Sequence, residues 1–265
     1  MTPAMAREFL FCSEDSDMAG SALHAPDAEY LAAVNRADEM ARLQAQAQRR
    51  KSMLIYGPEG AGKTRLLQNF VPTQPLALYV AQMRSPRELM LALIQDLRGL
   101  AKRELRLPAN PQALSTSSLK GMVHRALDEF PFLLVLDHLA GPSRVVTGMI
   151  RELHHYGRTP VYFAARTPHM EDVGGLLPMC ADRSEKLEIR NLAPSVALEF
   201  AKREAAGTAL RASNLETVLH SLVDWSKGNP GSILQMLKMA TLSRYRMGDQ
   251  IKAHVLYLDY RMGRR

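Results

Sequence analysis

The stretch SMLIYGPEGAGKT, residues 52–64, decides the fold of this chain. Its apolar first part predicts a buried strand, and TRLLQNF, residues 64–70, predicts a helix. Between them, GPEGAGKT has the GxxxxGK[ST] spacing of a P-loop, whose glycines let backbone N–H groups surround phosphates beside the N-terminus of a helix. In such a loop Lys63 contacts the β- and γ-phosphates, and the Thr64 hydroxyl binds magnesium. The stretch therefore predicts that the chain binds ATP with Mg2+.

The whole loop contributes to this site. Its predicted nucleotide-binding residues are Gly57, Pro58, Glu59, Gly60, Ala61, Gly62, Lys63, Thr64 and Arg65. A chance match to the motif is the alternative, but the strand before it and the helix after it are the context that a P-loop needs.

A second candidate site follows the apolar run FLLVL, residues 132–136. Asp137 ends this predicted strand, where its carboxylate can hold the water shell of magnesium opposite Thr64; Thr64 and Asp137 are thus the predicted metal site. A turn-forming aspartate is the alternative. His138 occupies the position where many P-loop ATPases have a glutamate that orients water, so fast hydrolysis is not expected. His138 either takes over that task or is a bystander.

Two arginines are candidates for contacting the γ-phosphate. Arg166 ends VYFAAR, residues 161–166, on the strand expected beside the P-loop strand, and its guanidinium suits bidentate phosphate contacts. Arg183 precedes the last predicted strand and could reach the nucleotide of a neighbouring subunit as an arginine finger. Each is alternatively a surface arginine. The predicted catalytic residues are Lys63, Asp137, His138 and Arg166.

Short apolar runs alternate with helical patterns along the first two thirds of the chain. This alternation predicts right-handed crossovers and a five-stranded parallel sheet between two layers of helices, the three-layer α/β/α core of a P-loop NTPase. The predicted strands are 52–56, 76–81, 132–136, 160–165 and 186–189. The predicted helices are 63–70, 86–104, 117–129, 143–156 and a short piece at 169–177.

No strand pattern follows Leu192, and helices are expected at 194–204, 214–225, 230–243 and 249–260. We therefore expect a small all-helical lid. GNPGSI, residues 228–233, places Pro230 at a helix start, where its backbone can lie against adenine and link the lid to the nucleotide. The expected domains are an N-terminal tail, 1–25; a nucleotide-binding domain with a lead-in helix that Asn35 can cap, 26–191; and the lid with a basic C-terminal helix, 192–265.

The composition is that of an ordinary globular protein, with 34 Lys and Arg against 27 Asp and Glu. The clusters at 49–51 and at Arg261, Arg264 and Arg265 either contact the phosphates of DNA or are solvated helix ends. Cys12 and Cys180 are the only two cysteines and show no disulfide or zinc pattern, which favours a reducing cytoplasm. No apolar stretch reaches the length of about 18 residues of a membrane span, so no membrane association is expected.

The order of these blocks resembles the STAND branch of the AAA+ superfamily, the signal-transduction ATPases that include NB-ARC proteins, over about residues 35–240. NRADEMARL, residues 35–43, is similar to the lead-in of that family, which implies that Arg36 lies near the nucleotide base. FAAR, 163–166, is similar to its sensor strand, LEIRNLAPSVALEFAKREA, 187–205, to the entry into its helical subdomain, and GNPGSILQM, 228–236, to its GLPLA-like motif. His138 in place of an acid, and Asn229 and Gly231 in the last motif, depart from the family pattern.

Three functional hypotheses follow. The first is an ATP-dependent molecular switch with slow, Mg2+-dependent hydrolysis that self-associates and acts on a protein partner. The second is a DNA-associated ATPase, because the architecture is also similar to standalone AAA+ ATPases that assist transposition or load replication proteins. The third is a nucleotide-binding module without turnover. A small-molecule kinase shares the P-loop, but FLLVLDHL and the helical tail do not fit it.

Overall fold

The computed structural model describes residues 36–83, 85–100, 107, 110–139, 141–156, 158–208 and 210–263. The expected tail at 1–25, the cap residue Asn35, Cys12, and the basic residues Arg264 and Arg265 lie outside the described residues.

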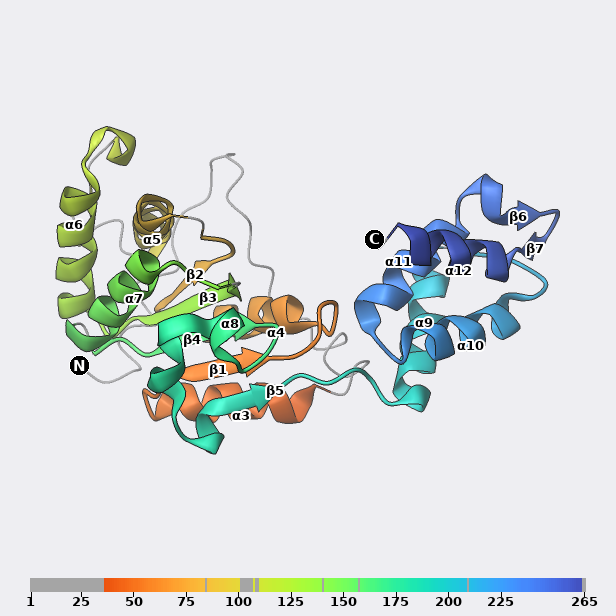
Figure 1. The fold of residues 1–265 in the computed structure, drawn as a ribbon, viewed down its shortest axis with the longest axis horizontal. Coiled ribbons are helices and arrows are strands. Elements are labelled where there is room, and N and C mark those ends of the chain that lie inside the picture. Colours follow the sequence, from red (N-terminus) through yellow and green to blue (C-terminus); the bar gives the residue numbers. More distant parts are fainter. Residues whose placement is uncertain are drawn as a thin grey trace.

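Five parallel strands form one sheet in the order β2-β3-β4-β1-β5 (Figure 1). The strands are β1 Met53–Tyr56, β2 Ala77–Val80, β3 Leu133–Leu139, β4 Val161–Ala165 and β5 Lys186–Glu188. Strand β1, which leads into the P-loop, lies between β4 and β5, with Ile55 opposite both Ala164 and Leu187. The predicted parallel α/β sheet is confirmed, and so is the position of the strand before Arg166 beside the P-loop strand.

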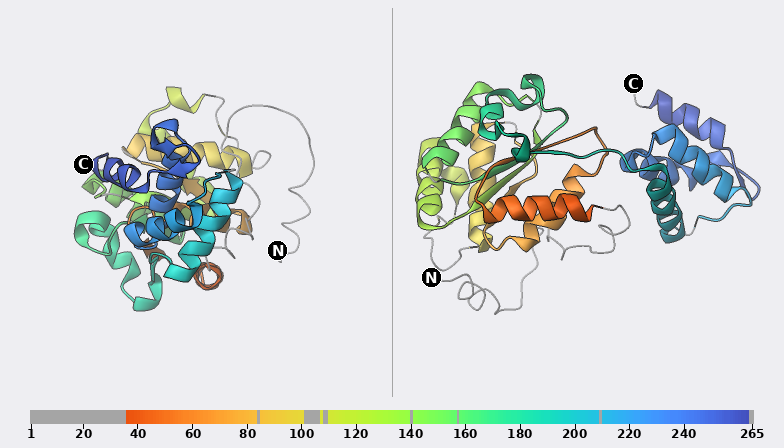
Figure 2. Two further views of the ribbon diagram at one scale, coloured as in Figure 1. Left: turned by 90° about the vertical axis from the view of Figure 1, so that its right-hand side faces the viewer. Right: turned by 90° about the horizontal axis from the view of Figure 1, so that it is seen from below.

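Helices cover both faces of the sheet, which gives the three predicted layers (Figure 2). They are α3 Ala37–Gln48, α4 Lys63–Phe70, α5 Pro86–Leu100, α6 Thr116–Glu129, α7 Arg144–Tyr156 and α8 Met170–Val173, with short 3-10 turns at Val71–Thr73, Pro111–Ala113, Gly174–Cys180 and Arg183–Glu185. Because successive strand residues point to opposite faces, Leu54 packs with α5, α6 and α7, whereas Ile55 packs with α3 and α4.

The face under α3 and α4 is held by an aromatic contact as well as by aliphatic packing. The rings of Phe70 and Tyr162 stack with their centroids 5.4 Å apart. The buried Tyr162 hydroxyl donates a hydrogen bond to the Leu43 carbonyl at 2.9 Å, so its polar atom is satisfied. This bond fixes α3 against the sheet immediately below the P-loop helix.

Strand β3 differs from the prediction because it continues to Leu139 instead of ending at Leu136. Between Leu136 and Leu139 its register against β4 shifts: three steps along β3 match two steps, from Phe163 to Ala165, along β4. One extra residue therefore forms a β-bulge at Asp137 and His138, and His138 adopts a positive φ of 51°.

The C-terminal part of the chain forms a second hydrophobic core. Its helices are α9 Pro194–Gly207, α10 Leu215–Ser226, α11 Pro230–Ala240 and α12 Ala253–Met262, with a 3-10 turn at Ser243–Tyr245. Figure 1 shows this helical unit beside the α/β unit, joined to β5 by an extended segment.

The expectation that no strand follows Leu192 was wrong. Two short strands, β6 Arg246–Met247 and β7 Gln250–Ile251, pair in an antiparallel hairpin. Its two-residue turn begins at Gly248, whose φ of +60° suits the tight hairpin geometry. The hairpin takes up part of the segment predicted as helix. Helix α11 therefore ends at Ala240, three residues before the predicted 243, and α12 begins at Ala253, four residues after the predicted 249.

Candidate functional site

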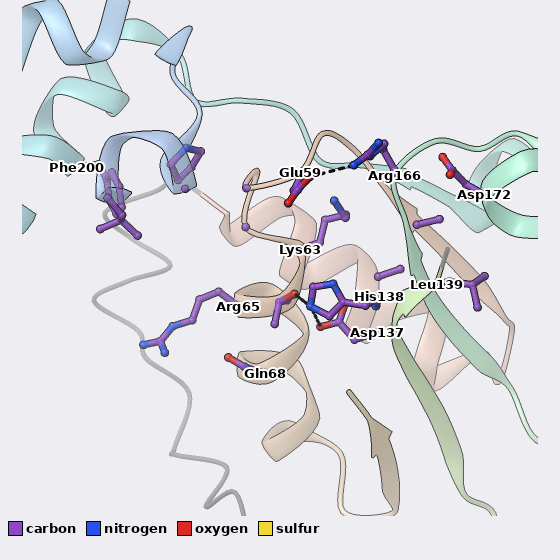
Figure 3. A pocket seen from close by; sticks show the side chains of 18 of the residues that line it. Glu59, Lys63, Arg65, Gln68, Asp137, His138, Leu139, Arg166, Asp172 and Phe200 are labelled. Carbon is purple, nitrogen blue, oxygen red and sulfur yellow. Dashed lines mark hydrogen bonds and ion pairs between the residues drawn. The ribbon is translucent and has the colours of Figure 1, made fainter. Parts of the chain in front are cut away.

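A cleft of about 860 Å3 lies at the carboxyl end of the sheet, where the α/β unit meets the helical unit. The loop before α4, the ends of β3 and β4, and side chains of α9 and α11 line it (Figure 3). This edge is where parallel α/β sheets bind ligands, because the loops that follow the strands converge there. All four predicted catalytic residues line this one cleft.

The P-loop passes directly from β1 into α4, whose first residue is Lys63. The Lys63 ammonium donates hydrogen bonds to the carbonyls of Gly57 and Pro58 at 2.7 and 2.9 Å. Burial lowers the pKa of Lys63, opposed by the negative charges of Asp137 and Glu59. Both of these hydrogen bonds go to neutral carbonyls, and a phosphate at the N-terminus of α4 would supply a charged acceptor for this partly desolvated ammonium.

Asp137 is the most deeply buried acidic group of the cleft, with 1% of its surface exposed. Its Oδ1 accepts the backbone N–H of His138 at 2.8 Å, and its Oδ2 accepts the Tyr79 hydroxyl at 3.0 Å. Burial and the neighbouring Asp137 raise the pKa of Tyr79, so that its hydroxyl stays protonated as a donor. Both hydrogen bonds to this buried carboxylate come from neutral donors, which leaves its negative charge available for a bound cation.

Thr64 supplies the second oxygen that a magnesium ion would use. Its Oγ1 lies 3.2 Å from Nε2 of His138, which in turn lies 3.7 Å from Asp137 Oδ2. Hydroxyl and carboxylate oxygens are the hard donors that Mg2+ prefers, with phosphate oxygens and water completing its shell. The residues present therefore fit a magnesium ion held with a nucleotide.

Arg166 follows β4 and extends toward the P-loop (Figure 3). Its guanidinium forms an ion pair with Glu59 at 3.0 Å, with 66% and 80% of the two side chains exposed. Such an exposed pair contributes little stability, at most about 1 kcal/mol. Arg166 can therefore exchange Glu59 for a phosphate at small cost.

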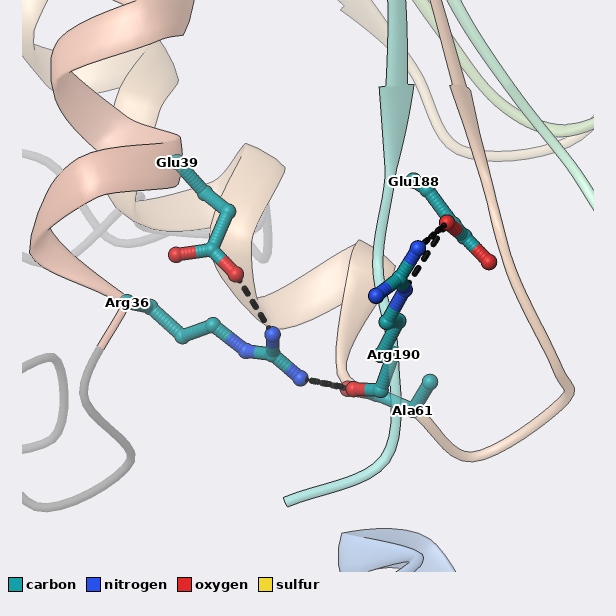
Figure 4. Close-up of polar contacts among 5 residues, drawn as sticks. All are labelled: Arg36, Glu39, Ala61, Glu188 and Arg190. Carbon is teal, nitrogen blue, oxygen red and sulfur yellow. Dashed lines mark hydrogen bonds and ion pairs between the residues drawn. The ribbon is translucent and has the colours of Figure 1, made fainter. Parts of the chain in front are cut away.

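Arg36 lies beside the loop but not in the cleft (Figure 4). Its guanidinium pairs with Glu39 at 2.6 Å and donates to the carbonyls of Ala61 and Arg190. It is 8% exposed, so this set of contacts ties α3 to the P-loop and to the segment after β5. The contact of Arg36 with the nucleotide base, which the resemblance implied, stays a prediction, and in the structure the guanidinium binds protein groups.

The helical unit contacts the P-loop directly. The Gly231 N–H donates to the Gly60 carbonyl at 2.9 Å, and the Asn229 side-chain amide donates to the Glu59 carbonyl at 2.9 Å. The backbones approach so closely that a Cβ on Gly231 would lie 2.7 Å from the Gly60 Cα. Pro230, predicted to meet adenine, lines the cleft between these two contacts. We call these two hydrogen bonds the lid contact.

Two important residues were missed by the sequence analysis. Tyr79 contacts Asp137 from the neighbouring strand β2, and no spacing rule reveals that pairing. Asn229 caps α11, since its Oδ1 accepts the Ser232 N–H at 3.0 Å, while its amide binds the P-loop. Its place before Pro230 is a recognisable helix-cap signal that could have found it.

The basic residues considered for DNA binding are partly engaged within the protein. Arg50 donates to the carbonyls of Pro131 and Arg158 at 2.9 and 3.3 Å, and Lys51 lies 3.5 Å from a Glu185 carboxylate oxygen. Arg183 stands just before β5, which runs parallel to β1. It therefore lies at the amino-terminal edge of the sheet, opposite the edge that holds the chain's own P-loop.

None of the described helices is both long and apolar enough to cross a membrane. The free thiol of Cys180 is buried.

Comparison with solved structures agrees with this architecture. A scan of protein-family models finds no match, and neither does a search of curated protein sequences. Among solved structures, a Walker-type ATPase of Pyrococcus abyssi is similar with a TM-score of 0.62 and 18% identity, covering 90% of this chain and 75% of that one.

Two further archaeal structures are similar. The Orc1 protein of Aeropyrum pernix, solved in complex with DNA, has a TM-score of 0.63 and 12% identity, covering 86% of this chain and 65% of its own. Cdc6p of Pyrobaculum aerophilum has a TM-score of 0.56 and 12% identity, covering 77% of this chain and 60% of its own. This chain thus spans less than two thirds of either protein. The structural neighbours are AAA+ P-loop ATPases, and at these identities the similarity shows a shared fold.

Proposed function

We propose that this protein is an ATP-dependent molecular switch of the AAA+ type that binds ATP with Mg2+ and hydrolyses it slowly. The observation that carries the proposal is the convergence of Lys63, Thr64, Asp137 and Arg166 on one cleft beneath the lid contact. No other class of ligand accounts as well for a P-loop lysine, a hydroxyl and a buried carboxylate at the same edge of a parallel sheet.

Each residue has a defined task in this proposal. The amides of the loop and Lys63 bind the phosphates, and the guanidinium of Arg166 leaves Glu59 for the γ-phosphate. Thr64 and Asp137 hold the magnesium ion, which neutralises phosphate charge when bound. His138 substitutes for the glutamate that usually orients water, and an imidazole in an exposed, strained position is a poor replacement for it. Slow turnover follows.

In this proposal the lid contact connects the nucleotide site to the helical unit and so transmits the nucleotide state. Because Gly231 and Asn229 hydrogen-bond the backbone of Gly60 and Glu59, any adjustment of the P-loop around phosphate acts directly on the start of α11. A nucleotide that binds one arrangement more tightly shifts the population toward it. By analogy with the STAND branch, the nucleotide-bound form self-associates and presents a surface to a protein partner.

A DNA-associated ATPase is the second candidate. The structural similarity to Orc1, solved in complex with DNA, and the formal net charge of +7 favour it. If phosphates are contacted, retention on DNA falls steeply as salt rises, with log affinity linear in log salt concentration. A weak response that does not change with salt would remove this candidate.

The test of the proposed function is ATP turnover by the wild type, Lys63→Ala and His138→Glu, each with and without DNA. We expect slow turnover in the wild type, none above background in Lys63→Ala, and faster turnover in His138→Glu, because the carboxylate restores a better water-orienting group. Stimulation of the wild type by DNA would support the second candidate. Tight ATP binding without turnover under any condition would identify a nucleotide-binding module and contradict the hydrolytic part of the proposal.

A further inference from the structure

The imidazole of His138 lies between the two residues that are expected to hold the metal ion. Its Nε2 is 3.2 Å from Thr64 Oγ1 and 3.7 Å from Asp137 Oδ2 (Figure 3). A nitrogen donor therefore stands beside a hydroxyl and a carboxylate oxygen, in a type of site that is otherwise made of oxygen atoms alone.

The backbone positions the imidazole there at a cost. The β-bulge in β3 and the positive φ of His138 turn its side chain toward α4, and a non-glycine residue in this region costs on the order of 1 kcal/mol. Burial of the side chain does not offset this strain, because 59% of the His138 side chain is exposed. Within the same bulge, Asp137 Oδ1 accepts a hydrogen bond from the backbone N–H of His138, so the two side chains are held in a fixed arrangement.

The distances from the His138 imidazole nitrogen to the two oxygen donors are close to those expected around one cation. With metal–ligand bonds of about 2.1 Å, neighbouring donors lie about 3.0 Å apart at right angles and about 3.4 Å apart at tetrahedral angles. The Thr64–His138 separation of 3.2 Å, which is a hydrogen bond when no metal is bound, lies between these values, and the His138–Asp137 separation of 3.7 Å is slightly longer than the larger one. Imidazole binds first-row transition metals well, whereas Mg2+ prefers oxygen.

We infer that His138 is a metal ligand and that the nucleotide site, which accepts Mg2+ in the proposed function, binds a first-row transition-metal dication, from Mn2+ to Zn2+, more tightly than Mg2+. This inference rests on the proposed nucleotide-binding function. Within the part of the chain that the structure describes, no three His, Cys, Asp or Glu side chains form a metal site. Thr64, His138 and Asp137 supply three donors, fewer than the roughly four to six ligands of such a metal, so phosphate oxygens complete the shell and the metal binds tightly only together with nucleotide.

The test uses Mn2+ and ADP with the full chain, because Mn2+ is paramagnetic. Electron spin echo envelope modulation detects the 14N nucleus of an imidazole bound directly to Mn2+. We expect this signal in the wild type and in His220→Asn, an exposed histidine of α10, and we expect it to be lost in His138→Asn and His138→Glu. Adenine nitrogens are present in all samples, so the difference between variants isolates His138.

A second readout is the affinity for a fluorescent ADP analogue with Mn2+, Co2+ or Mg2+. We expect the ratio of Mn2+- or Co2+-supported to Mg2+-supported affinity to fall at least about tenfold in His138→Asn and to remain unchanged in His220→Asn. His138→Glu should still bind the ADP analogue with metal, but with a higher relative affinity in Mg2+. Retained binding in this variant would show that its site is folded.

Three results would overturn the inference. Bound Mn2+ and ADP without an imidazole signal would mean that His138 does not coordinate the metal, while leaving nucleotide binding intact. A rise in Mg2+-supported affinity in His138→Asn with an unchanged metal ratio would mean that His138 only obstructs the site. Absence of ADP binding by the wild type with every metal would overturn the proposed function as well.

Discussion

Asp137 depends on a hydroxyl from a residue 58 positions earlier in the chain. Tyr79 in β2 and Asp137 in β3 come together only because those strands pair, and Oδ2 then has a fixed donor. A hydrogen bond to a ligating carboxylate orients it for the metal, so Tyr79 is a positioning residue of the proposed site.

Replacing Tyr79 with phenylalanine removes this donor while retaining the ring. We expect metal-supported nucleotide affinity to fall about tenfold, because the carboxylate loses its fixed orientation. Metal-free nucleotide affinity and the thermal unfolding midpoint should change little. Fluorescence titration with and without metal measures the difference, and Tyr257→Phe in α12 is the matched control. An equal loss without metal would show that Tyr79 supports the P-loop and not the metal site.

The sequence predicted the residues of the P-loop and the place of Asp137 after the apolar run of β3 because those motifs are local, although β3 itself continues to Leu139. A run of glycines and a lysine encodes its own backbone path. The position of His138 could not be predicted, because it depends on how β3 pairs with β4 around the bulge. Arg36 was assigned to the base through resemblance. Its contacts with the carbonyls of Ala61 and Arg190, which lie 25 and 154 positions away, depend on how the chain folds back on itself.

At the scale of the elements, α5 and β2 share one half-buried acidic group. Asp96 of α5 accepts the backbone N–H of Tyr79 at 2.6 Å through its Oδ2. Burial raises the pKa of Asp96 from 3.8 to about 6, although the bond from Tyr79 opposes the shift. The packing of the helix on the strand therefore favours the neutral carboxyl.

This shift predicts a pH dependence of stability. The folded state binds the proton more tightly than the unfolded state, so the contribution is fully present below pH 3.8 and is lost as the pH rises through about 6. Asp96→Asn should remove this loss and be more stable than the wild type at pH 7 by up to about 3 kcal/mol. Urea unfolding at pH 4, 5, 6 and 7 measures it. Parallel pH profiles for the two proteins would contradict the prediction.

Elements with strong periodicity were predicted well, and those set by turns were not. Strands β1 to β5 are buried apolar runs, so their existence and their parallel pairing followed from the alternation of patterns. The hairpin of β6 and β7 has strands of two residues each, too short for any periodicity. The turn residue Gly248 was its only local signal, and packing against the helical core decided the rest.

For the whole molecule, the lid contact is the feature that connects the two hydrophobic cores at the cleft. Gly231 of α11 donates to the Gly60 carbonyl, and Asn229 donates to Glu59. The sequence indicated a helix start at Pro230. It could not indicate that this backbone touches the P-loop, because the contact joins Glu59 and Asn229, which are 170 positions apart.

Gly231→Ala tests the lid contact. The added Cβ would lie 2.7 Å from the Gly60 Cα, so the backbones must separate, at a cost of about 1–3 kcal/mol. We expect a lower thermal unfolding midpoint and weaker nucleotide binding, because Gly231 also lines the cleft. Gly207→Ala is the control, since a Cβ there meets nothing within 4 Å. Unchanged binding in Gly231→Ala would mean that the lid contact does not act on the nucleotide site.

The most direct test of the central claim is equilibrium binding of ATP by isothermal titration calorimetry, with Mg2+, for the wild type and Lys63→Ala. We predict one ATP bound per wild-type chain and at least a thirtyfold loss of affinity, about 2 kcal/mol or more, in Lys63→Ala, because the phosphates lose a partly buried charge partner. No binding by the folded wild type, or equal binding by the two proteins, would contradict the assignment of this cleft as an ATP site.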